Sequence, residues 1–180
     1  MTALTGIPRA ALAGLGLGLG WGIAARIWMR LISTDPEFSW SGTGMILGAT
    51  AVGGLVFGLL YGVRRAGRSR WWRLLAVVWL VILAGPGLPF LPAFLLGGLV
   101  WLRQTWARAV GVAAILASEA ALWLVMRTEV EPIDPWILYG GFLVLSIGLS
   151  VGSAELQRPR PVAEPALGRQ LTSGGPEVAA

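Results

Sequence analysis

The sequence contains no cysteine, no histidine and no lysine among its 180 residues. Without cysteine it can form no disulfide and offers no thiolate to a metal. Without histidine it lacks imidazole ligands and every histidine-activated nucleophile, which excludes serine–histidine and zinc proteases. No Asp lies inside a predicted span to form an aspartyl protease pair, and no phosphate-binding glycine loop ends in lysine. The chain is therefore predicted to be noncatalytic, without a cofactor or a metal centre.

Charge is also scarce, because only 13% of the residues are charged, whereas a soluble domain carries about a quarter. Hydrophobic residues make up 56% of the chain and its mean hydropathy is +0.72. Long uncharged stretches of this kind suit a bilayer. The composition predicts an all-α, polytopic integral membrane protein surrounded by membrane lipid. Exclusive use of arginine as the basic residue is typical of a GC-rich bacterial genome, so we expect a bacterial cytoplasmic membrane.

Six transmembrane helices are expected, near residues 10–32, 42–63, 71–85, 90–103, 106–126 and 135–154. The third and fourth come from one uncharged stretch, residues 74–102, which is too long for a single upright span of about 20 residues. We divide it at Gly85–Pro92, where three prolines and two glycines favour a turn. One kinked helix or a re-entrant segment is the alternative. Residues 1–156 form the membrane domain, and 157–180 are expected to be a disordered tail.

Five arginines between the second and third spans set the expected orientation, because positive charge marks cytoplasmic loops. They are Arg64, Arg65, Arg68, Arg70 and Arg73. Dividing the long stretch returns Arg103 and Arg108 to the same side and places acidic residues 129–134 outside. Both termini are then cytoplasmic. We interpret the five arginines as topogenic residues that touch anionic lipid, and we predict no nucleic-acid binding.

Two glycine ladders stand out, each with i, i+4 spacing that places its members on one helix face. The first is Gly14, Gly18 and Gly22, and the second is Gly54, Gly58 and Gly62. Small residues at this spacing allow membrane helices to approach closely. The ladders are expected either to pack the first two helices within one chain or to support a homo-oligomer or a contact with another membrane protein.

Glu119 lies inside the fifth predicted span, where an uncompensated charge costs at least about 2.5 kcal/mol. Arg26, on the first span, is expected at a similar depth below the outer boundary. We therefore predict an intramembrane ion pair between Arg26 and Glu119. Such a pair could be a structural clamp or part of a proton or substrate path, with Ser118, Ser146 and Ser150 extending a polar seam.

The end of the first predicted helix is dense in charged and aromatic residues and is expected to form an outer-boundary platform. Its members are Trp28, Arg30, Asp35, Glu37 and Trp40. Tryptophan favours the headgroup layer, and a proline turn would present the two carboxylates. The acidic outer loops could hold a divalent cation if they met, but solvation and contact with Arg30 and Arg127 explain them more simply.

Two functions remain open from the sequence. A noncatalytic scaffold or assembly partner is favoured by the glycine ladders and by the scarcity of polar residues in the spans. The alternative is a small transporter or proton-coupled permease that uses Glu119 and Arg26. Its six helices would then form two inverted groups of three, although the sequence shows no convincing internal repeat.

Overall fold

The computed structural model describes residues 6–33, 39–67, 70–85, 87–127 and 134–158, which are helical apart from short connections and contain no strand. Four helices in these ranges are long and apolar enough to cross a membrane. They are α1 (Gly6–Leu31), α2 (Trp40–Arg65), α5 (Thr105–Met126) and a helix over Trp136–Gln157 that joins a π-helical turn, η4 (Trp136–Gly140), to α6 (Gly141–Gln157). The all-helical prediction is confirmed for the described residues, and the four long apolar helices support a membrane-embedded protein.

Two shorter apolar helices lie between α2 and α5. The first joins the 3-10 helix η1 (Arg70–Ala76) to α3 (Val77–Leu83). The second consists of η2 (Leu88–Phe90), α4 (Leu91–Leu96) and η3 (Gly97–Trp101), of which η2 and η3 are 3-10 helices. The break falls in the predicted glycine- and proline-rich turn, where Gly85 has a φ of 86° that suits a residue without a side chain. The long uncharged stretch is therefore two helices rather than one kinked helix.

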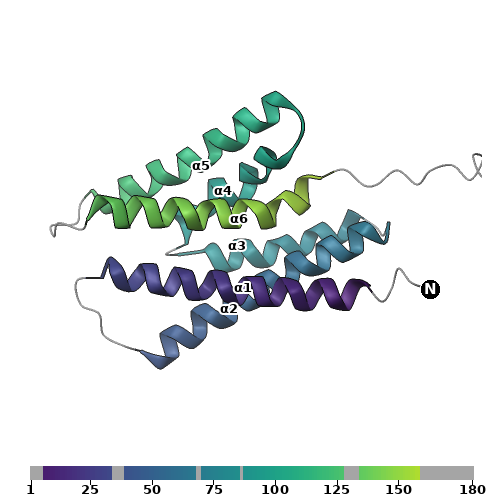
Figure 1. The fold of residues 1–180 in the computed structure, drawn as a ribbon, viewed down its shortest axis with the longest axis horizontal. Coiled ribbons are helices and arrows are strands. Elements are labelled where there is room, and N and C mark those ends of the chain that lie inside the picture. The colour runs from purple at the N-terminus through teal and green to yellow at the C-terminus, as the bar shows by residue number, and fades with distance from the viewer. Residues whose placement is uncertain (1–5, 34–38, 68–69, 86, 128–133, 159–180) are drawn as a thin grey trace, which may run out of the picture.

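Successive helices run in alternating directions, so that the beginning of α1 and the end of α6 lie at the same end of the bundle (Figure 1). The helices form two groups, since α2 packs against α1, η1 and α3, while α5 and α6 pack against α4 and η3. The two groups meet where α6 contacts α1 and α2. In chain order, the first group consists of two long helices and then a short one, and the second group consists of a short helix and then two long ones.

The two glycine ladders face each other across the α1–α2 contact. A methyl group added at Gly14 would overlap the carbonyl oxygen of Gly54 and lie 2.7 Å from the Gly58 Cα. One added at Gly18 would overlap the carbonyl oxygen of Thr50. A methyl group added at three other ladder glycines would also meet atoms of the opposite helix. At Gly22 it would meet the Thr50 side chain, at Gly58 the Ala10 backbone and at Gly62 the Ile7 Cα. The structure therefore uses both ladders inside one chain.

A different kind of packing joins the two groups, in which aromatic rings fill the glycine positions of the last helix. Trp28 lies over Gly141, Trp21 over Gly148 and Phe57 over Gly152. Their spacing along the helix lets α1 and α2 lay three large rings directly on its backbone. A fourth ring-on-glycine contact lies within the first group, where Trp79 covers Gly53.

The buried indoles also donate hydrogen bonds to helix carbonyl oxygens. Trp21 Nε1 donates to the Leu145 oxygen at 2.9 Å, and Trp79 Nε1 donates to the Gly53 oxygen at 3.0 Å. Trp28 Nε1 donates to the oxygens of residues 137 and 138 at 3.0 and 3.1 Å. Both lie in the π-helical turn, where the ordinary α-helical bonding is interrupted and a carbonyl can accept a second partner. These bonds satisfy indole N–H groups that lipid could not.

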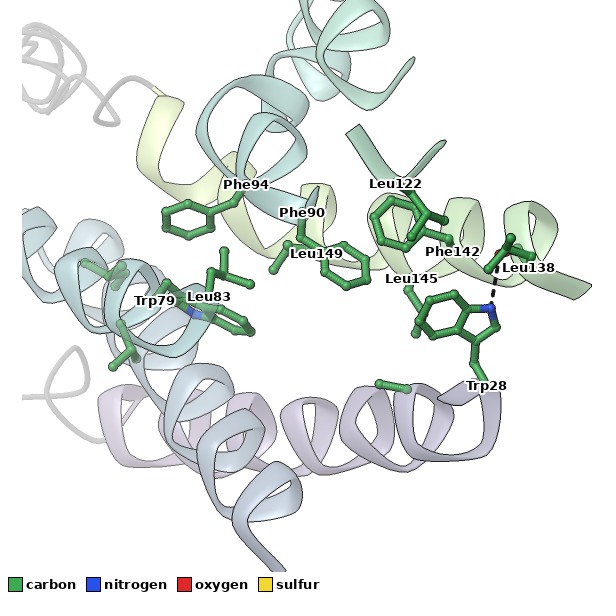
Figure 2. Close-up of a cluster of buried hydrophobic side chains, with 13 residues drawn as sticks. Trp28, Trp79, Leu83, Phe90, Phe94, Leu122, Leu138, Phe142, Leu145 and Leu149 are labelled. Carbon is green, nitrogen blue, oxygen red and sulfur yellow. Dashed lines mark hydrogen bonds between the residues drawn. The ribbon is translucent and has the colours of Figure 1, made fainter. Parts of the chain in front are cut away.

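An aromatic core results at the centre of the molecule (Figure 2). Phe90 and Phe142 stack with their ring centroids 4.2 Å apart, and Phe57 stacks on Trp79 at 5.1 Å. Trp21 meets Trp79 edge-on at 6.1 Å. Rings from both groups together fill the space between them.

The α1–α2 contact generates a paired test. Gly18→Ala should destabilise the protein by about 1–3 kcal/mol, because the new methyl group meets backbone atoms that cannot move aside. Gly16→Ala, two residues away on the same helix, adds a methyl group with nothing within 4 Å and should be neutral. The midpoint of thermal unfolding in detergent measures both. Equal midpoints for the two variants would contradict this packing.

Candidate functional site

Arg26 bridges α1 and α2 at the end where the two helices diverge (Figure 1). The side chain is partly buried, and its Nε donates a hydrogen bond to Thr43 Oγ1 at 3.1 Å. No described residue forms an ion pair with it. The guanidinium group therefore lies near the surface of the bundle between two helices, with most of its donors uncommitted within the described part of the chain.

Glu119 is not the partner of Arg26 in the structure. Both carboxylate oxygens of Glu119 are buried and have no hydrogen-bond partner. Equal depth in the membrane does not bring two side chains together, because helices at the same depth need not be neighbours. Here α1 packs against α2 and α6, whereas α5 packs against α4, η3 and α6.

The expected outer-boundary platform is divided by the structure. Trp28 is buried, and its indole points into the bundle against the last helix rather than to the membrane boundary. Its hydrogen bond to the π-helical turn explains the difference, since burial of the ring completes the aromatic core. Arg30 and Trp40 are exposed, as a platform requires. Asp35 and Glu37 lie outside the described residues.

The best-formed polar cluster joins α2 to α6 at the end of the bundle that carries Gly6 and Arg158. Glu155 is 9% exposed, and its Oε2 accepts hydrogen bonds from Nε and a terminal nitrogen of Arg64, each at 2.8 Å. Its other oxygen, Oε1, accepts from Arg158 at 2.6 Å. Arg73 in turn donates to the Arg158 carbonyl oxygen at 3.0 Å. We call Arg64, Arg73, Glu155 and Arg158 the arginine–glutamate cluster.

The arginines predicted to set the topology therefore differ in their roles. Arg64 and Arg73 belong to the cluster. Arg65 is exposed, with its guanidinium carbon 5.3 Å from the Tyr61 ring centroid, a distance at which a cation–π attraction operates. Arg68 and the Arg70 side chain lie outside what the structure describes. Charge counting treats all five alike, whereas packing distinguishes them.

Sequence reasoning missed Glu155, which directly follows the last predicted span, residues 135–154. A signal was present. It is an acidic residue among small apolar ones at the end of a span. Because α2 and α6 run in the same direction, their carboxyl ends lie at the same end of the bundle, and Glu155 is level with the arginine-rich end of α2. An acid in that position with two arginines in reach is a natural interhelical ion pair.

The predicted polar seam forms in part on the α4–α5–α6 side. Ser118 Oγ accepts a hydrogen bond from the Ala93 backbone N–H at 2.9 Å. Ser150 Oγ donates to the Ile147 oxygen at 2.7 Å and accepts from Trp101 Nε1 at 3.1 Å. Ser146 is completely buried, yet its hydroxyl has no partner. The first two hydroxyls hold helices together, while the third is unused.

The described residues contain no group of three or more acidic, histidine or cysteine side chains that could hold a metal ion. Asp134, from the acidic outer loops, instead accepts a hydrogen bond from the Trp136 N–H at 2.8 Å and so caps the last helix. The other loop acids, Glu129 and Glu131, fall outside the described ranges.

No known protein family matches this sequence, and comparisons with curated proteins and with solved structures gave no significant match.

The arginine–glutamate cluster can be tested by a double-mutant cycle. Arg64→Gln and Glu155→Gln should each lower stability, and the pair should show a coupling energy of about 1–3 kcal/mol because the bonds are charge-assisted and largely buried. Thermal or denaturant unfolding in detergent supplies the four values. Arg65→Gln, the adjacent exposed arginine, is the matched control and should show no coupling to Glu155→Gln. A coupling near zero for Arg64 would mean that the ion pair does not hold α2 to α6.

Proposed function

We propose that the protein is a noncatalytic scaffold or assembly partner of a bacterial cytoplasmic membrane, and that the first half of α2 receives a transmembrane helix of another membrane protein. The observation that carries this is the fork between α1 and α2. The first half of α2 leaves the bundle (Figure 1), and the buried residues of this helix begin only at Thr50. Trp40 is 80% exposed and Met45 is 74% exposed.

Two glycines make this half of α2 suitable for a close helix contact. Gly44 and Gly48 are one turn apart on the helix and have nothing within 4 Å of an added methyl group. Arg26 lies in the same fork and can donate hydrogen bonds to a polar group on the incoming helix. By contrast, the two ladders singled out from the sequence are occupied within the chain. An assembly surface must therefore be sought at Gly44 and Gly48.

Six spans are supported by the helix geometry of the two short segments. A 3-10 helix rises about 2.0 Å per residue, compared with about 1.5 Å in an α-helix. The first segment has seven residues of each kind, so its length is about 25 Å. The second has eight 3-10 and six α-helical residues and is also about 25 Å long. Both approach the hydrocarbon thickness of about 30 Å.

The orientation follows from where the described arginines lie. The end that carries Gly6 holds most of them, namely Arg9, Arg64, Arg65, Arg73, Arg103, Arg108 and Arg158, with Glu155 as its described acid. Under the positive-inside rule that end is cytoplasmic, so both termini are inside. Exposed Trp71, Trp101 and Trp106 mark the same boundary.

A proton-coupled permease is the second candidate, supported by the unpartnered carboxylate of Glu119. Two features weigh against it. The matched pair with Arg26 is absent, and the order of long and short helices reads long, long, short, then short, long, long. A duplicated three-helix unit would repeat one order in both halves.

Topology can be measured with single cysteines, since the chain has none of its own. Leu88→Cys, at the exposed turn between the short helices, should react with a membrane-impermeant maleimide added outside intact spheroplasts. Gln104→Cys should react only after the membrane is opened, and Ser41→Cys serves as the outer control. Protection of Leu88→Cys while Ser41→Cys reacts would rule out six spans. Reaction of Gln104→Cys alone from outside would reverse the orientation.

Assembly can be measured by crosslinking in native membranes. Met45→Cys in the fork should crosslink to a second polypeptide, whereas Val144→Cys, equally apolar and 67% exposed on α6 near the same end, should not. Gly44→Leu should abolish the crosslink of Met45→Cys without lowering the thermal midpoint, because the glycine touches nothing in the monomer. Equal yields at both positions, or none at either, would contradict a partner at the fork.

A further inference from the structure

A three-helix junction in the second group fixes the relative levels of α4–η3, α5 and α6. A methyl group added at Gly97 would lie 3.0 Å from Ser150 Cβ, 3.5 Å from Ile115 Cγ1 and 3.6 Å from Ala93 Cβ. Gly97, Ile115 and Ser150 therefore share one level, with the three helices in mutual contact there.

One helical turn toward the outer end brings a second set of residues to a common level. The helices alternate in direction, so this step leads from Gly97 to Ala93, from Ile115 to Glu119 and from Ser150 to Ser146. The hydrogen bond from Ala93 N–H to the Ser118 hydroxyl independently places this turn of α5 beside Ala93. Because residues one turn apart lie on the same helix face, Glu119 and Ser146 project into the same junction.

Three buried polar atoms at this level have no hydrogen-bond partner in the described part of the chain. Both oxygens of Glu119 and the hydroxyl of Ser146 are withdrawn from the surface and form no hydrogen bond, and Ser146 is completely buried. A buried ionised carboxylate without a partner costs several kcal/mol, whereas a protonated one gains a donor. The Ser146 oxygen lies at the same level but is not hydrogen-bonded to Glu119 in the structure, so a side-chain rotation is needed for it to accept this hydrogen bond.

Among the described residues of α5 and of the helices packed against it, no cation forms an ion pair with Glu119. The helices that pack against α5 are η2–α4–η3, which contain no ionisable residue, and α6, whose ionisable residue is Glu155. Glu155 lies about 13 Å from Ser146 along α6 and is committed to Arg64 and Arg158. On α5 itself, Arg127 and Arg108 are about 12 Å and 16 Å along the axis, where Arg127 stacks on Trp123 and Arg108 donates to the Leu102 oxygen.

We propose that Glu119 and Ser146 form a proton-exchanging site inside the membrane. A proton taken from water bonds to a Glu119 oxygen, and the resulting O–H donates a hydrogen bond to Ser146 Oγ. Release of the proton to water restores the carboxylate. The site would give a protein of this class a response to pH at the α4–α5–α6 junction, separate from the α1–α2 fork.

Infrared spectroscopy of the full-length protein in lipid nanodiscs tests this site. The wild type should show a protonated carboxyl band that declines as the pH is raised. The band should be absent in Glu119→Gln and should move in frequency in Ser146→Ala. Ser153→Ala is the matched control, because Ser153 is equally buried on α6 but already donates to the Ser150 oxygen. Its spectrum should match the wild type.

The outcomes that overturn the proposal are equally specific. A wild type without the band, or a band that persists in Glu119→Gln, would remove Glu119 as the proton carrier. An unchanged band in Ser146→Ala would separate the two residues. Replacement of potassium by sodium at constant pH should leave the band unaltered, and its loss would identify a sodium site instead. If Glu119→Gln does not fold, Ser146→Ala and Glu119→Asp still decide the matter, since either should move the band.

Discussion

The backbone contact between α1 and α2 is the constraint on which the rest of the structure depends. Lipid tails solvate apolar side chains as well as a protein interior does, so helices in a bilayer associate mainly through close packing and hydrogen bonds. Opposed glycines at Gly14, Gly18 and Gly54 let the two backbones touch. Dispersion contacts fall off steeply with separation, so a single extra methyl group at this crossing would weaken the whole contact.

That crossing also determines where the aromatic side chains point. With the glycine faces of α1 and α2 turned toward each other, Trp21, Trp28 and Phe57 project toward the last helix. The three rings pack against glycines of α6. Two of them, Trp21 and Trp28, also donate indole N–H hydrogen bonds to carbonyl oxygens of the last helix. Because each ring packs at a glycine position, the two helix groups cannot slide past each other without breaking these contacts. Rocking of the two groups would break these bonds inside lipid, where no water replaces them. This rigidity agrees better with a scaffold than with alternating access.

Local chemistry was readable from the sequence, whereas pairing between distant segments was not. Apolar length and the Gly85–Pro92 turn located every helix to within a few residues, because burial in lipid and helix-breaking residues act locally. The partner of Arg26 could not be found in this way. Depth is a one-dimensional coordinate, and choosing Glu119 also required knowing that α1 and α5 are neighbours. Trp28 shows the same limit, since an interfacial tryptophan and a buried one at a helix end look identical in sequence.

The two buried carboxylates on α5 and α6 differ in a way that composition could not reveal. Glu155 lies at the cytoplasmic end proposed above, where its ion pairs with Arg64 and Arg158 join α2 to α6. Glu119 lies within a span, beside small residues and with no cation in reach. A carboxylate of this kind gains nothing for folding that a glutamine or leucine would not supply, because it neither bonds nor pairs. Under the proposal made above, the Glu155 carboxylate joins two helices, whereas the Glu119 carboxylate exchanges a proton with the solvent.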